Sequence, residues 1–413
     1  MDVIYDTNKQ KVPIKAWLNK DQIEDGCLEQ AVNLSNLPFV YKHVVLLSDT
    51  HQGYGMPIGG VIATENNIIV NAVGRDISCG MNFFSTNIPA ELLKTQTPNG
   101  SLTQAIVGNI LRNVPVGRTH HKQKQTNIRL DTVIDIWKEE INPVLSAELL
   151  PEIESVYYQI GTLGSGNHFI EIQEDENGNV CIMLHSGSRN LGYKICGYFD
   201  NIAKDLNEKW LSNVPKEYDL AFLPLNTPEC KEYLIWMNLA MDFAEENRNV
   251  MKLKIENILF NMIKKYTNFD HIRKHNEIDI NHNYCNIEHH FGKNVWVHRK
   301  GAIRLRKGDV GIIPGAMGSY SYIVEGLGSP LTFESCGHGA GRRMGRKKAS
   351  EEITVQQTIE DLNNQGIVLG KSKKDDVAEE SRFAYKDIDE VIENQKDILV
   401  VKKRLKTIGV IKA

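Results

Sequence analysis

Residues 335–346, SCGHGAGRRMGR, place one histidine between glycines and follow it with three arginines. Glycine lets the backbone approach a ligand closely, and glycine-rich loops can turn N–H groups toward an anion. The planar guanidinium of arginine suits phosphate groups. The segment therefore indicates either an imidazole, that of His338, presented to a phosphate, or a flexible loop that leads into a basic surface helix. On these residues alone both interpretations stay open.

The composition of the chain shows no general signature of a polyanion-binding protein. The chain has 413 residues, a formal net charge of −4, 24% charged residues and 41% hydrophobic residues. These values are ordinary for a soluble globular protein, and the length fits two or three domains or one large α/β domain with insertions. A site for a phosphate-rich ligand must therefore be a local patch.

The cysteines and the N-terminal segment indicate a reducing compartment. Seven scattered cysteines without a C-x-x-C pair argue against a disulfide framework. The N-terminal MDVIYDTNKQK has early acidic residues and no apolar core, so it does not resemble a secretory signal. No apolar run reaches the ~18 residues of a membrane span. We therefore expect a cytoplasmic protein with no membrane partner.

Strands and helices alternate along the chain and are separated by glycine-rich loops, which favours a mixed α/β (α+β) fold. No linker divides the chain, so we expect a single domain, residues 1–413. The expected helices are 21–36, 132–148, 236–266 and 387–395; the expected strands are 43–48, 181–184, 295–297 and 309–313, with a hairpin at 65–67 and a strand at the C-terminal end. Residues 279–283 are expected on a polar turn, and the charged run 346–381 is expected to be solvated and to need no partner.

One pattern recurs six times: an apolar strand is followed by a glycine-rich loop that holds a polar or metal-binding side chain. A lone histidine is usually a structural residue, but six such strand ends make that interpretation far less plausible. The six positions are Asp76 with Cys79, Asn167 with His168, His185, His282 with Asn283, His298, and His338.

The spacing of Asp76 and Cys79 lets two side chains reach one metal ion. Thiolate, carboxylate and imidazole ligands together suit zinc, manganese or cobalt better than magnesium or calcium. The carboxylate, the thiolate and the imidazoles together make five protein ligands, which is more than the four of a single tetrahedral zinc site. We therefore expect two metal ions bridged by Cys79. The structural alternative is a buried Cys79 with Asp76 paired to Arg75.

Cationic residues lie on the same loops, namely Arg189, Arg299, Lys300, Arg342 and Arg346. Two metal ions surrounded by cationic side chains are typical of enzymes that transfer phosphoryl or nucleotidyl groups. In these enzymes catalysis is mostly positioning and charge stabilisation. A neutral histidine is a competent nucleophile toward phosphorus, and His338 is the best placed for that role. His51 and His298 are then left for acid–base chemistry or substrate contacts.

With these residues assembled, the chain resembles the RtcB family of RNA ligases along nearly its whole length. The order and number of the shared motifs make the resemblance specific. The motifs are DTHQGYGMPIGGVIA, GRDISCGMN, GTLGSGNHFIEIQ, HSGSRNLGYKI, DINHN, VHRKGAIR, IIPGAMGSYSY, CGHGAGRRMGR, AYKDIDEVIENQ and the final IK.

The resemblance implies one compact α/β domain whose strand-end glycine-rich loops form a central cleft for metal and nucleotide. It implies an enzyme of RNA repair or tRNA splicing that joins RNA 2′,3′-cyclic phosphate or 3′-phosphate ends to 5′-hydroxyl ends, using GTP and two Mn²⁺ ions. His338 corresponds to the histidine that becomes guanylylated. The corresponding metal ligands are Asp76, Cys79, His168, His185 and His282.

The resemblance also implies a guanine-nucleotide pocket and contacts to RNA. In the pocket, Glu171 would accept hydrogen bonds from the base, which favours guanine over adenine. Arg189 and Lys300 match positions expected to hold RNA phosphates, and Arg342 is a further candidate for a phosphate contact. The implied pocket residues are Asn167, His168, Phe169, Ile170, Glu171, His282, Asn283, Pro314, Gly315, Ala316, Met317, Ser321, His338, Gly339, Ala340, Gly341 and Lys412.

The implied reaction has three steps: His338 attacks the α-phosphate of GTP, the RNA 3′-phosphate takes the guanylyl group, and the 5′-hydroxyl displaces GMP. One rival is a metal-dependent RNA 3′-end phosphatase or cyclic phosphodiesterase, or a 3′-end guanylyl-capping enzyme without ligation. Another is a non-catalytic RNA-binding chaperone. The physiological RNA, the metal in the cell, an activating protein partner and the oligomeric state stay open.

Three positions depart from the pattern of the family. Ala316 stands where a hydroxyl residue is usual, and Asn190 replaces a usual glycine. Arg75 precedes Asp76 where a small or apolar residue is expected, and it could pair with Asp76 or reach the substrate. These departures suggest a divergent branch specialised for particular broken RNAs.

Overall fold

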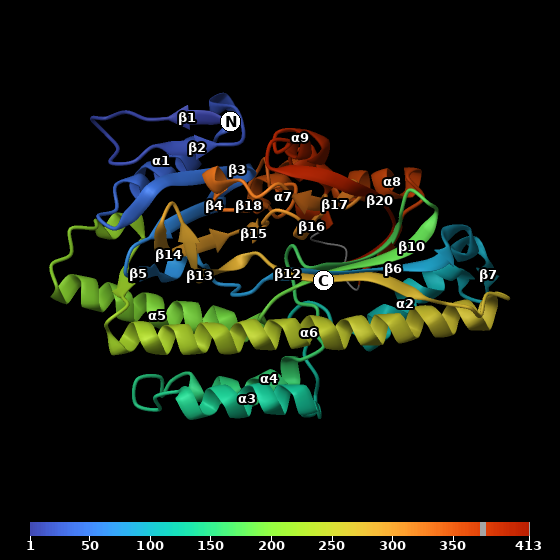
Figure 1. The fold of residues 1–413 in the computed structure, drawn as a ribbon. Coiled ribbons are helices and arrows are strands. Elements are labelled where there is room, and N and C mark those ends of the chain that lie inside the picture. The colour runs from blue at the N-terminus through green and yellow to red at the C-terminus, as the bar shows by residue number, and fades with distance from the viewer. Residues whose placement is uncertain (372–376, 413) are drawn as a thin grey trace.

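The computed structural model of the protein describes residues 1–371 and 377–412. Two β-sheets form its upper and middle parts, and long helices lie beneath them (Figure 1). The helices are α1 Asp25–Ser35, α2 Leu102–Asn113, α3 Ile128–Glu140, α4 Leu150–Gln159, α5 Arg189–Lys209, α6 Pro228–Tyr266, α7 Arg346–Glu352, α8 Val355–Asn364 and α9 Ile388–Glu393.

The larger sheet has eight strands in the order β12-β6-β10-β9-β20-β17-β16, with β19 paired to β20 off this path. Its edge strands β12 and β16 contact each other, so the sheet is nearly closed. The strands are β6 Gly80–Pro89, β9 Phe169–Glu174, β10 Asn179–Ser186, β12 Lys274–Asn281, β16 Val310–Ile313, β17 Ser321–Gly326, β19 Val368–Gly370 and β20 Leu399–Lys412.

The smaller sheet has six strands in the order β1-β2-β3-β4-β14-β13. These are β1 Asp2–Ile4, β2 Ile14–Ala16, β3 Val40–Tyr54, β4 Met56–Thr64, β13 Asn283–His290 and β14 Lys293–Lys300. Three short strand pairs complete the fold: β5 Asn67–Ile69 with β11 Phe222–Pro224, β7 Gln96–Thr97 with β8 Gly100–Ser101, and β15 Ala302–Arg304 with β18 Ser335–Gly337.

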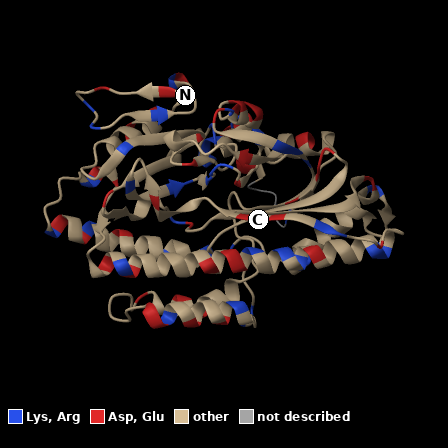
Figure 2. Ribbon diagram, viewed as in Figure 1, with Lys and Arg blue, Asp and Glu red and all other residues tan. Residues whose placement is uncertain are grey.

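Helix α6 supports the large sheet along its length. Thr227 caps the first turn through a hydrogen bond from the Cys230 N–H, and Pro228 occupies the first helical position. Its buried apolar residues pack on the sheet toward one end and on α3, α4 and α5 toward the other. In Figure 1, α6 runs beneath β6, β10 and β12, with α3 and α4 below it. Figure 2 shows charged residues of both signs along the helices, whereas the central strands are mostly uncharged.

The pairing of the strands brings distant residues to one place. Within the eight-stranded sheet, His185 on β10 lies opposite Met81 on β6 and opposite Phe169 on β9. Cys79 directly precedes β6 and His168 directly precedes β9, so the registers place these three side chains at the same end of neighbouring strands. This is the structural basis of the site.

Most of the expected helices and strands are present, but they begin or end at other residues than expected. The clearest helix begins earlier than residue 236, at Pro228, because Thr227 and Pro228 form a good N-terminus. The expected helix 132–148 is α3 and ends at Glu140. The hairpin expected at 65–67 was wrong, since β5 pairs with β11, while β4 pairs with β3 and β14. Residues 279–283 were also assigned wrongly to a turn. Residues 279–281 are the end of β12 and Asn283 begins β13, so His282 alone lies between the two strands.

Among the helices within residues 1–371 and 377–412, none has both the length and the apolar character needed to cross a membrane.

Candidate metal and nucleotide site

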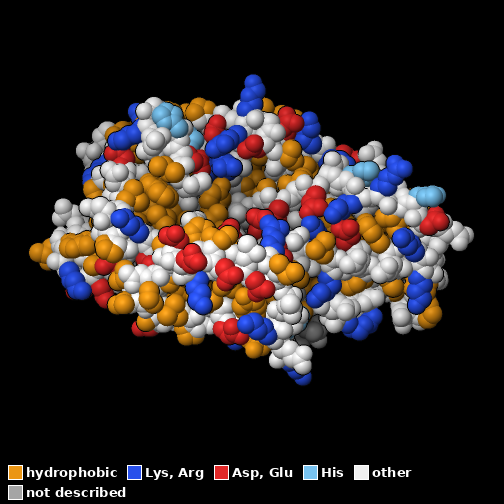
Figure 3. All heavy atoms as spheres, turned by 60° about the horizontal axis from the view of Figure 1, so that its bottom comes forward, with side chains coloured by type: hydrophobic (Ala, Val, Ile, Leu, Met, Phe, Trp, Pro, Cys, Tyr) orange, Lys and Arg blue, Asp and Glu red, His pale blue; other side chains and the backbone are white. Residues whose placement is uncertain are grey.

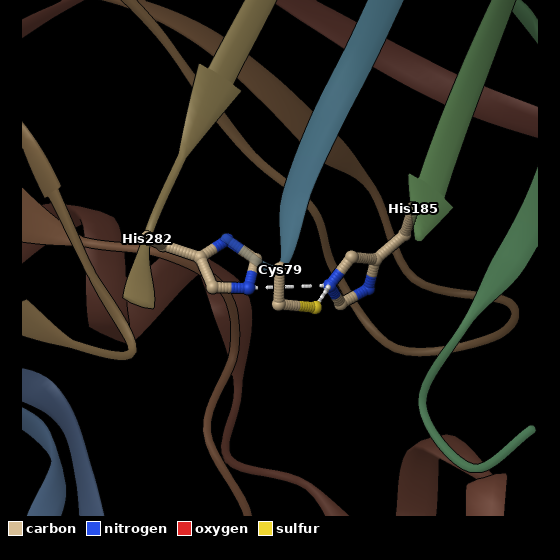
Figure 4. A group of neighbouring side chains, drawn as sticks. All are labelled: Cys79, His185 and His282. Carbon is tan, nitrogen blue, oxygen red and sulfur yellow. Dashed lines mark hydrogen bonds between the residues drawn. The ribbon is translucent and has the colours of Figure 1, made fainter. Parts of the chain in front are cut away.

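Cys79, His185 and His282 form a buried group at the ends of β6, β10 and β12 (Figure 4). The Cys79 Sγ lies 3.1 Å from the His185 Nε2, which lies 3.3 Å from the His282 Nε2. The three ligand atoms face one another from three neighbouring strands. Such a set of thiol and imidazole groups has the chemistry of a transition-metal site.

A second group shares the same thiol. Cys79 Sγ lies 3.3 Å from the His168 Nε2, and that nitrogen lies 2.9 Å from the Asp76 Oδ2. All the ligand atoms within each group lie within 4.8 Å of one another. Because Cys79 belongs to both groups, the arrangement fits two metal ions bridged by one thiolate.

The surroundings of these side chains also fit a metal. The Asp76 Oδ1 and the His282 Nδ1 are buried and have no hydrogen-bond partner, which is rare for buried polar atoms unless an ion or water completes the site. The His168 Nδ1 is 2.9 Å from the Leu163 carbonyl oxygen, to which it donates. This hydrogen bond fixes the ring with its Nε2 toward the cluster, as the outer contacts of metal-binding histidines do.

The electrostatics of the group fit the same conclusion. Burial, together with the neighbouring histidines, holds the pKa of His185 and of His282 well below the usual value, so both rings stay neutral as metal ligands require. Burial and the nearby Asp76 raise the pKa of Cys79 well above its usual value. A thiolate at this position therefore needs a cation beside it.

His338 stands next to this cluster, with its ring centroid 4.7 Å from that of His282. Its Nδ1 lies 2.7 Å from the Asp49 Oδ2, and the same oxygen accepts from the His338 backbone N–H at 2.9 Å. An ionised carboxylate only accepts hydrogen bonds, so the ring proton lies on Nδ1 and the lone pair on Nε2. Asp49 was not predicted as a site residue, although it follows the apolar run of β3 and is fully buried.

The glycines around His338 are required by Asp49. Gly341 has a φ of +71°, and a Cβ there would lie 2.1 Å from the Asp49 carbonyl oxygen. A Cβ on Gly337 would lie 2.8 Å from the Asp49 Oδ1. The backbone of the loop can therefore pack against Asp49 only because these two positions lack side chains.

A cleft of about 860 Å³ opens beside His338. Most of the residues expected in the nucleotide pocket line it: Asn167, Phe169, Glu171, Pro314, Gly315, Ala316, Met317, His338, Gly339, Ala340, Gly341 and Lys412. His51 and Gln52 from β3 and Tyr385 before α9 complete part of the wall. Segments from both sheets therefore form one cavity.

The other expected pocket residues lie behind the cleft wall. The Ser321 Oγ accepts from the Gly315 N–H at 3.2 Å, which positions the loop after β16. Asn283 holds the metal loop, since its side chain donates to the Asp76 carbonyl oxygen and accepts from the Gly301 N–H. Ile170 points into the apolar core under the sheet. His168 and His282 belong to the metal groups.

Glu171 presents a partly satisfied carboxylate to the cleft. Its Oε2 accepts from Gln173 at 2.6 Å and from Thr407 at 3.1 Å, whereas no donor to Oε1 is found in the described part of the chain. Burial raises its pKa to about 7, against the opposing effect of these two donors and of Lys412. The free oxygen can accept hydrogen bonds from a ligand.

A buried ion-pair network closes the far side of the cleft. The Glu380 carboxylate lies 2.9 Å from the Lys412 Nζ, 2.6 Å from an Arg346 guanidinium nitrogen and 2.7 Å from the Tyr385 hydroxyl, which donates to it. Burial alone would raise the pKa of Glu380, but Lys412 and Arg346 hold it at about 2. The expectation that the charged run 346–381 is solvated was therefore wrong at Glu380, which is buried; residues 372–376 of this run lie outside the described residues.

The three cations expected to contact phosphate make other contacts here. The Lys300 Nζ donates to the carbonyl oxygens of Tyr54 and Asn71, and burial lowers its pKa to about 8. Arg189 donates to the Thr162 hydroxyl and the Gly117 carbonyl. Arg342 lines the cleft but donates to the carbonyl oxygens of Met344 and Glu379 and to the Tyr385 hydroxyl.

His298 of the strand-end pattern and the neighbouring cation Arg299 are structural. His298 is fully buried, accepts at Nε2 from the Ile69 N–H and donates from Nδ1 to the Trp296 carbonyl. Arg299 is also fully buried and pairs with Glu288 at 2.5 Å. The idea that His298 serves acid–base chemistry or substrate contacts was therefore wrong. His51 lines the cleft, and burial lowers its pKa to about 4.

The departures from the family pattern have distinct surroundings. Ala316 lines the cleft. Asn190 donates to Glu152 on α4. Arg75 does not pair with Asp76, and its guanidinium lies over the rings of Tyr54 and Tyr193.

The fold and this geometry define a mixed α/β protein in which two groups of potential metal ligands share Cys79 and lie beside a cleft lined by His338. The sequence pattern described as tRNA-splicing ligase RtcB matches residues 30–413. The chain is 37% identical to RNA-splicing ligase RtcB of Escherichia coli K12, over 98% of each protein. It is 31% identical to tRNA-splicing ligase RtcB of Nanoarchaeum equitans, over 98% of this chain and 96% of that one. The chain belongs to the RtcB family.

Proposed function

We propose that the protein is an RNA ligase that joins 2′,3′-cyclic phosphate or 3′-phosphate ends to 5′-hydroxyl ends through a guanylylated His338. The observation that supports this most directly is the contact of His338 with Asp49. It leaves the Nε2 lone pair free at the wall of the cleft and beside the metal groups. The names of the relatives from E. coli and N. equitans support RNA as the substrate.

In the first proposed step, the His338 Nε2 attacks the α-phosphorus of GTP. A P–N bond forms, the bond from the α-phosphorus to the bridging oxygen breaks, and pyrophosphate leaves. Asp49 keeps the proton on Nδ1 and stabilises the positive charge that the ring gains as Nε2 bonds to phosphorus. Histidine is suited to this role because the P–N bond that it forms can be broken again in the next step.

In the next steps, an oxygen of the RNA 3′-phosphate attacks the guanylyl phosphorus and the P–N bond breaks, which leaves an RNA with a 3′-diphosphate link to guanosine. The 5′-hydroxyl of the second RNA then attacks the RNA phosphorus, and GMP leaves. A cyclic phosphate must first be opened by water. His338 returns to its starting state with the Asp49 hydrogen bond in place.

Asp76, Cys79, His168, His185 and His282 would hold two metal ions, for which we propose Mn²⁺. When bound, the ions would supply positive charge that polarises phosphoryl oxygens. For GTP, Glu171 offers its free oxygen to the base, and Lys412, fixed by Glu380, stands at the same wall of the cleft. We propose the cytoplasm as the compartment, since all seven cysteines are free.

The test is guanylylation of the purified protein with α-labelled GTP and Mn²⁺. We expect an acid-labile, hydroxylamine-resistant label, as a phosphoramidate requires, and His338→Ala should abolish it. His120→Ala, which changes an exposed histidine, should label normally. A label that persists in His338→Ala would show that another residue is the nucleophile.

A second assay separates ligation from the rival activities. RNAs with a 3′-phosphate or a cyclic phosphate are incubated with a 5′-hydroxyl RNA, GTP and Mn²⁺. The proposal requires a joined product. Release of phosphate without joining would favour a phosphatase, and accumulation of the guanosine-capped RNA would favour a capping enzyme.

A further inference from the structure

Three residues from separate segments form an exposed aromatic and cationic surface, the tyrosine–arginine platform (Tyr54, Arg75 and Tyr193). The Arg75 guanidinium carbon lies 5.6 Å from the centroid of the Tyr54 ring and 5.4 Å from that of the Tyr193 ring. These distances are within the ~6 Å at which a cation and an aromatic face attract. Arg75 is exposed, and Tyr54 and Tyr193 are 42% and 52% exposed.

The charge of Arg75 is not neutralised by the protein. Across residues 1–371 and 377–412, its side chain has neither a hydrogen bond nor an ion pair, and its nearest acidic neighbour in sequence, Asp76, contacts His168. Lys204, the other cation near Tyr54, differs because it pairs with Asp200 at 2.8 Å. The guanidinium donors of Arg75 therefore remain available to an anion.

Contacts with neighbouring segments hold the platform in place. The Tyr54 hydroxyl donates to Asp219 at 2.6 Å, and its carbonyl oxygen accepts from the Lys300 Nζ at 2.6 Å. Lys300 thus positions Tyr54. Helix α5, which contains Tyr193, packs closely on the segment after Arg75: a Cβ on Gly192 would lie 3.0 Å from the Ile77 backbone nitrogen.

The platform residues are next to residues of the candidate site along the chain. Arg75 directly precedes Asp76 of the metal groups. Tyr54 directly follows Gly53, which lines the cleft beside His338. Lys300, which holds the Tyr54 carbonyl, directly precedes Gly301, where a Cβ would lie 2.9 Å from the His338 Cε1. An RNA strand bound on the platform would therefore extend toward His338.

We propose that the tyrosine–arginine platform binds one nucleotide of single-stranded RNA next to its reacting end. The base would stack on an exposed tyrosine face, as bases do on aromatic residues of single-strand-binding proteins. The Arg75 guanidinium would contact the adjoining phosphate. Figure 3 shows acidic and basic side chains interspersed over the face displayed, and the net charge is −4, so local contacts of this kind have to supply the affinity.

This inference rests on the proposed function, and its test is RNA binding measured apart from ligation. Fluorescence anisotropy would follow binding of two oligonucleotides to the metal-loaded protein, one ending in a 3′-phosphate and one beginning with a 5′-hydroxyl. Loss of one stacked base or one phosphate contact should weaken binding about tenfold. We therefore expect Arg75→Ala and Tyr193→Ala to bind at least one of the two strands about tenfold more weakly, and the strand affected identifies the one on the platform.

One conservative variant and the salt dependence of binding separate stacking and charge from a structural role. Tyr193→Phe keeps the ring and should bind normally. Arg75→Ala should also lower the slope of log affinity against log salt by about 0.7, the value for one phosphate contact to a single strand. Arg273→Ala is the matched control, since this exposed arginine precedes the end of β12 remote from His282 and should change nothing.

Guanylylation distinguishes this inference from the proposed function, since it needs no RNA. The platform is supported if Arg75→Ala loses RNA affinity while its His338 is guanylylated at the normal rate. Unchanged affinity of Arg75→Ala and Tyr193→Ala for both strands overturns it, and so does a loss of labelling equal to the loss of RNA affinity. If the wild-type protein binds RNA through the platform but never takes label from GTP, the ligase proposal fails and the platform stands.

Discussion

At the scale of single residues, the pair His338–Asp49 decides what the cleft can do. Asp49 is fully buried and its Oδ2 accepts from both the backbone and the ring of His338. The hydrogen bonds fix the direction of the imidazole as well as its tautomer. A free, flexible histidine would spend most of its time with the wrong nitrogen or the wrong angle toward phosphorus.

Removing the carboxylate should slow guanylylation without removing the nucleophile. For Asp49→Ala we expect the labelling rate to fall about hundredfold, the scale of one preorganised electrostatic contact. Asp49→Asn keeps a hydrogen-bond acceptor but loses the charge, so its rate should lie between wild type and Asp49→Ala. Single-turnover labelling with GTP measures this order.

Asp242→Asn serves as the control, since this carboxylate accepts from Trp137 Nε1 on the surface of α6 and should leave labelling unchanged. Circular dichroism establishes that each variant is folded. Equal rates for wild type and Asp49→Ala would show that the orientation of His338 does not depend on Asp49.

At the scale of elements, the sequence indicates which apolar runs lead into candidate site residues, because glycine-rich loops follow such runs at Cys79, His168, His185 and His338. It cannot show which way each side chain points. His298 has the same local pattern, yet it faces backbone groups inside the six-stranded sheet. That difference depends on strand register, which is set by pairing with distant segments.

Contacts between distant segments also explain what the sequence did not reveal. Asp49 and His338 are 289 residues apart, and nothing local to either predicts the contact. Glu380 lies at the end of a charged run that is typical of solvated helices, whereas Lys412 ends strand β20. The pairing of β20 with β9 places Lys412 opposite Phe169, beside the cleft.

The Glu380–Lys412 pair should matter for stability. Both side chains are nearly inaccessible, with 5% and 7% of their surfaces exposed. Removing one partner of a buried ion pair typically costs several kcal/mol, so Glu380→Gln should lower the free energy of unfolding at pH 7 by about 3 kcal/mol. Urea unfolding gives this value, and Glu379→Gln, at an acid that is 29% exposed, should cost about 1 kcal/mol or less.

The pH dependence of that difference tests its electrostatic origin. The pKa of Glu380 is about 2 in the folded protein and 4.5 in its ordinary state. A depressed pKa gives stability that is fully present above the unfolded value and is lost as the pH falls toward the folded value. The difference between wild type and Glu380→Gln should therefore stay constant from pH 7 to about 5 and shrink below pH 4.5. A constant difference down to pH 3.5 would contradict the ion-pair origin.

At the scale of the whole molecule, the candidate metal site joins the two sheets. His282 lies between β12 of the large sheet and β13 of the small one. Its backbone N–H donates to the Cys79 carbonyl, and its own carbonyl accepts from the Ala302 N–H. An ion bound by Cys79 and His282 would therefore tie together segments from both sheets, so its removal should be felt by the whole fold.

Metal should raise the thermal stability of the chelator-treated protein. A ligand that binds only the folded state at 100 times its Kd adds about 2.7 kcal/mol of stability, so we expect a Tm increase of several degrees on adding Mn²⁺. Cys79→Ala removes the thiol shared by both groups, so this variant should show little increase and a lower metal content by elemental analysis. Cys230→Ala, at a cysteine buried in the core around α6, should lose some stability but respond to Mn²⁺ as the wild type does. Full metal content and an unchanged Tm increase in Cys79→Ala would rule out the bridging thiolate.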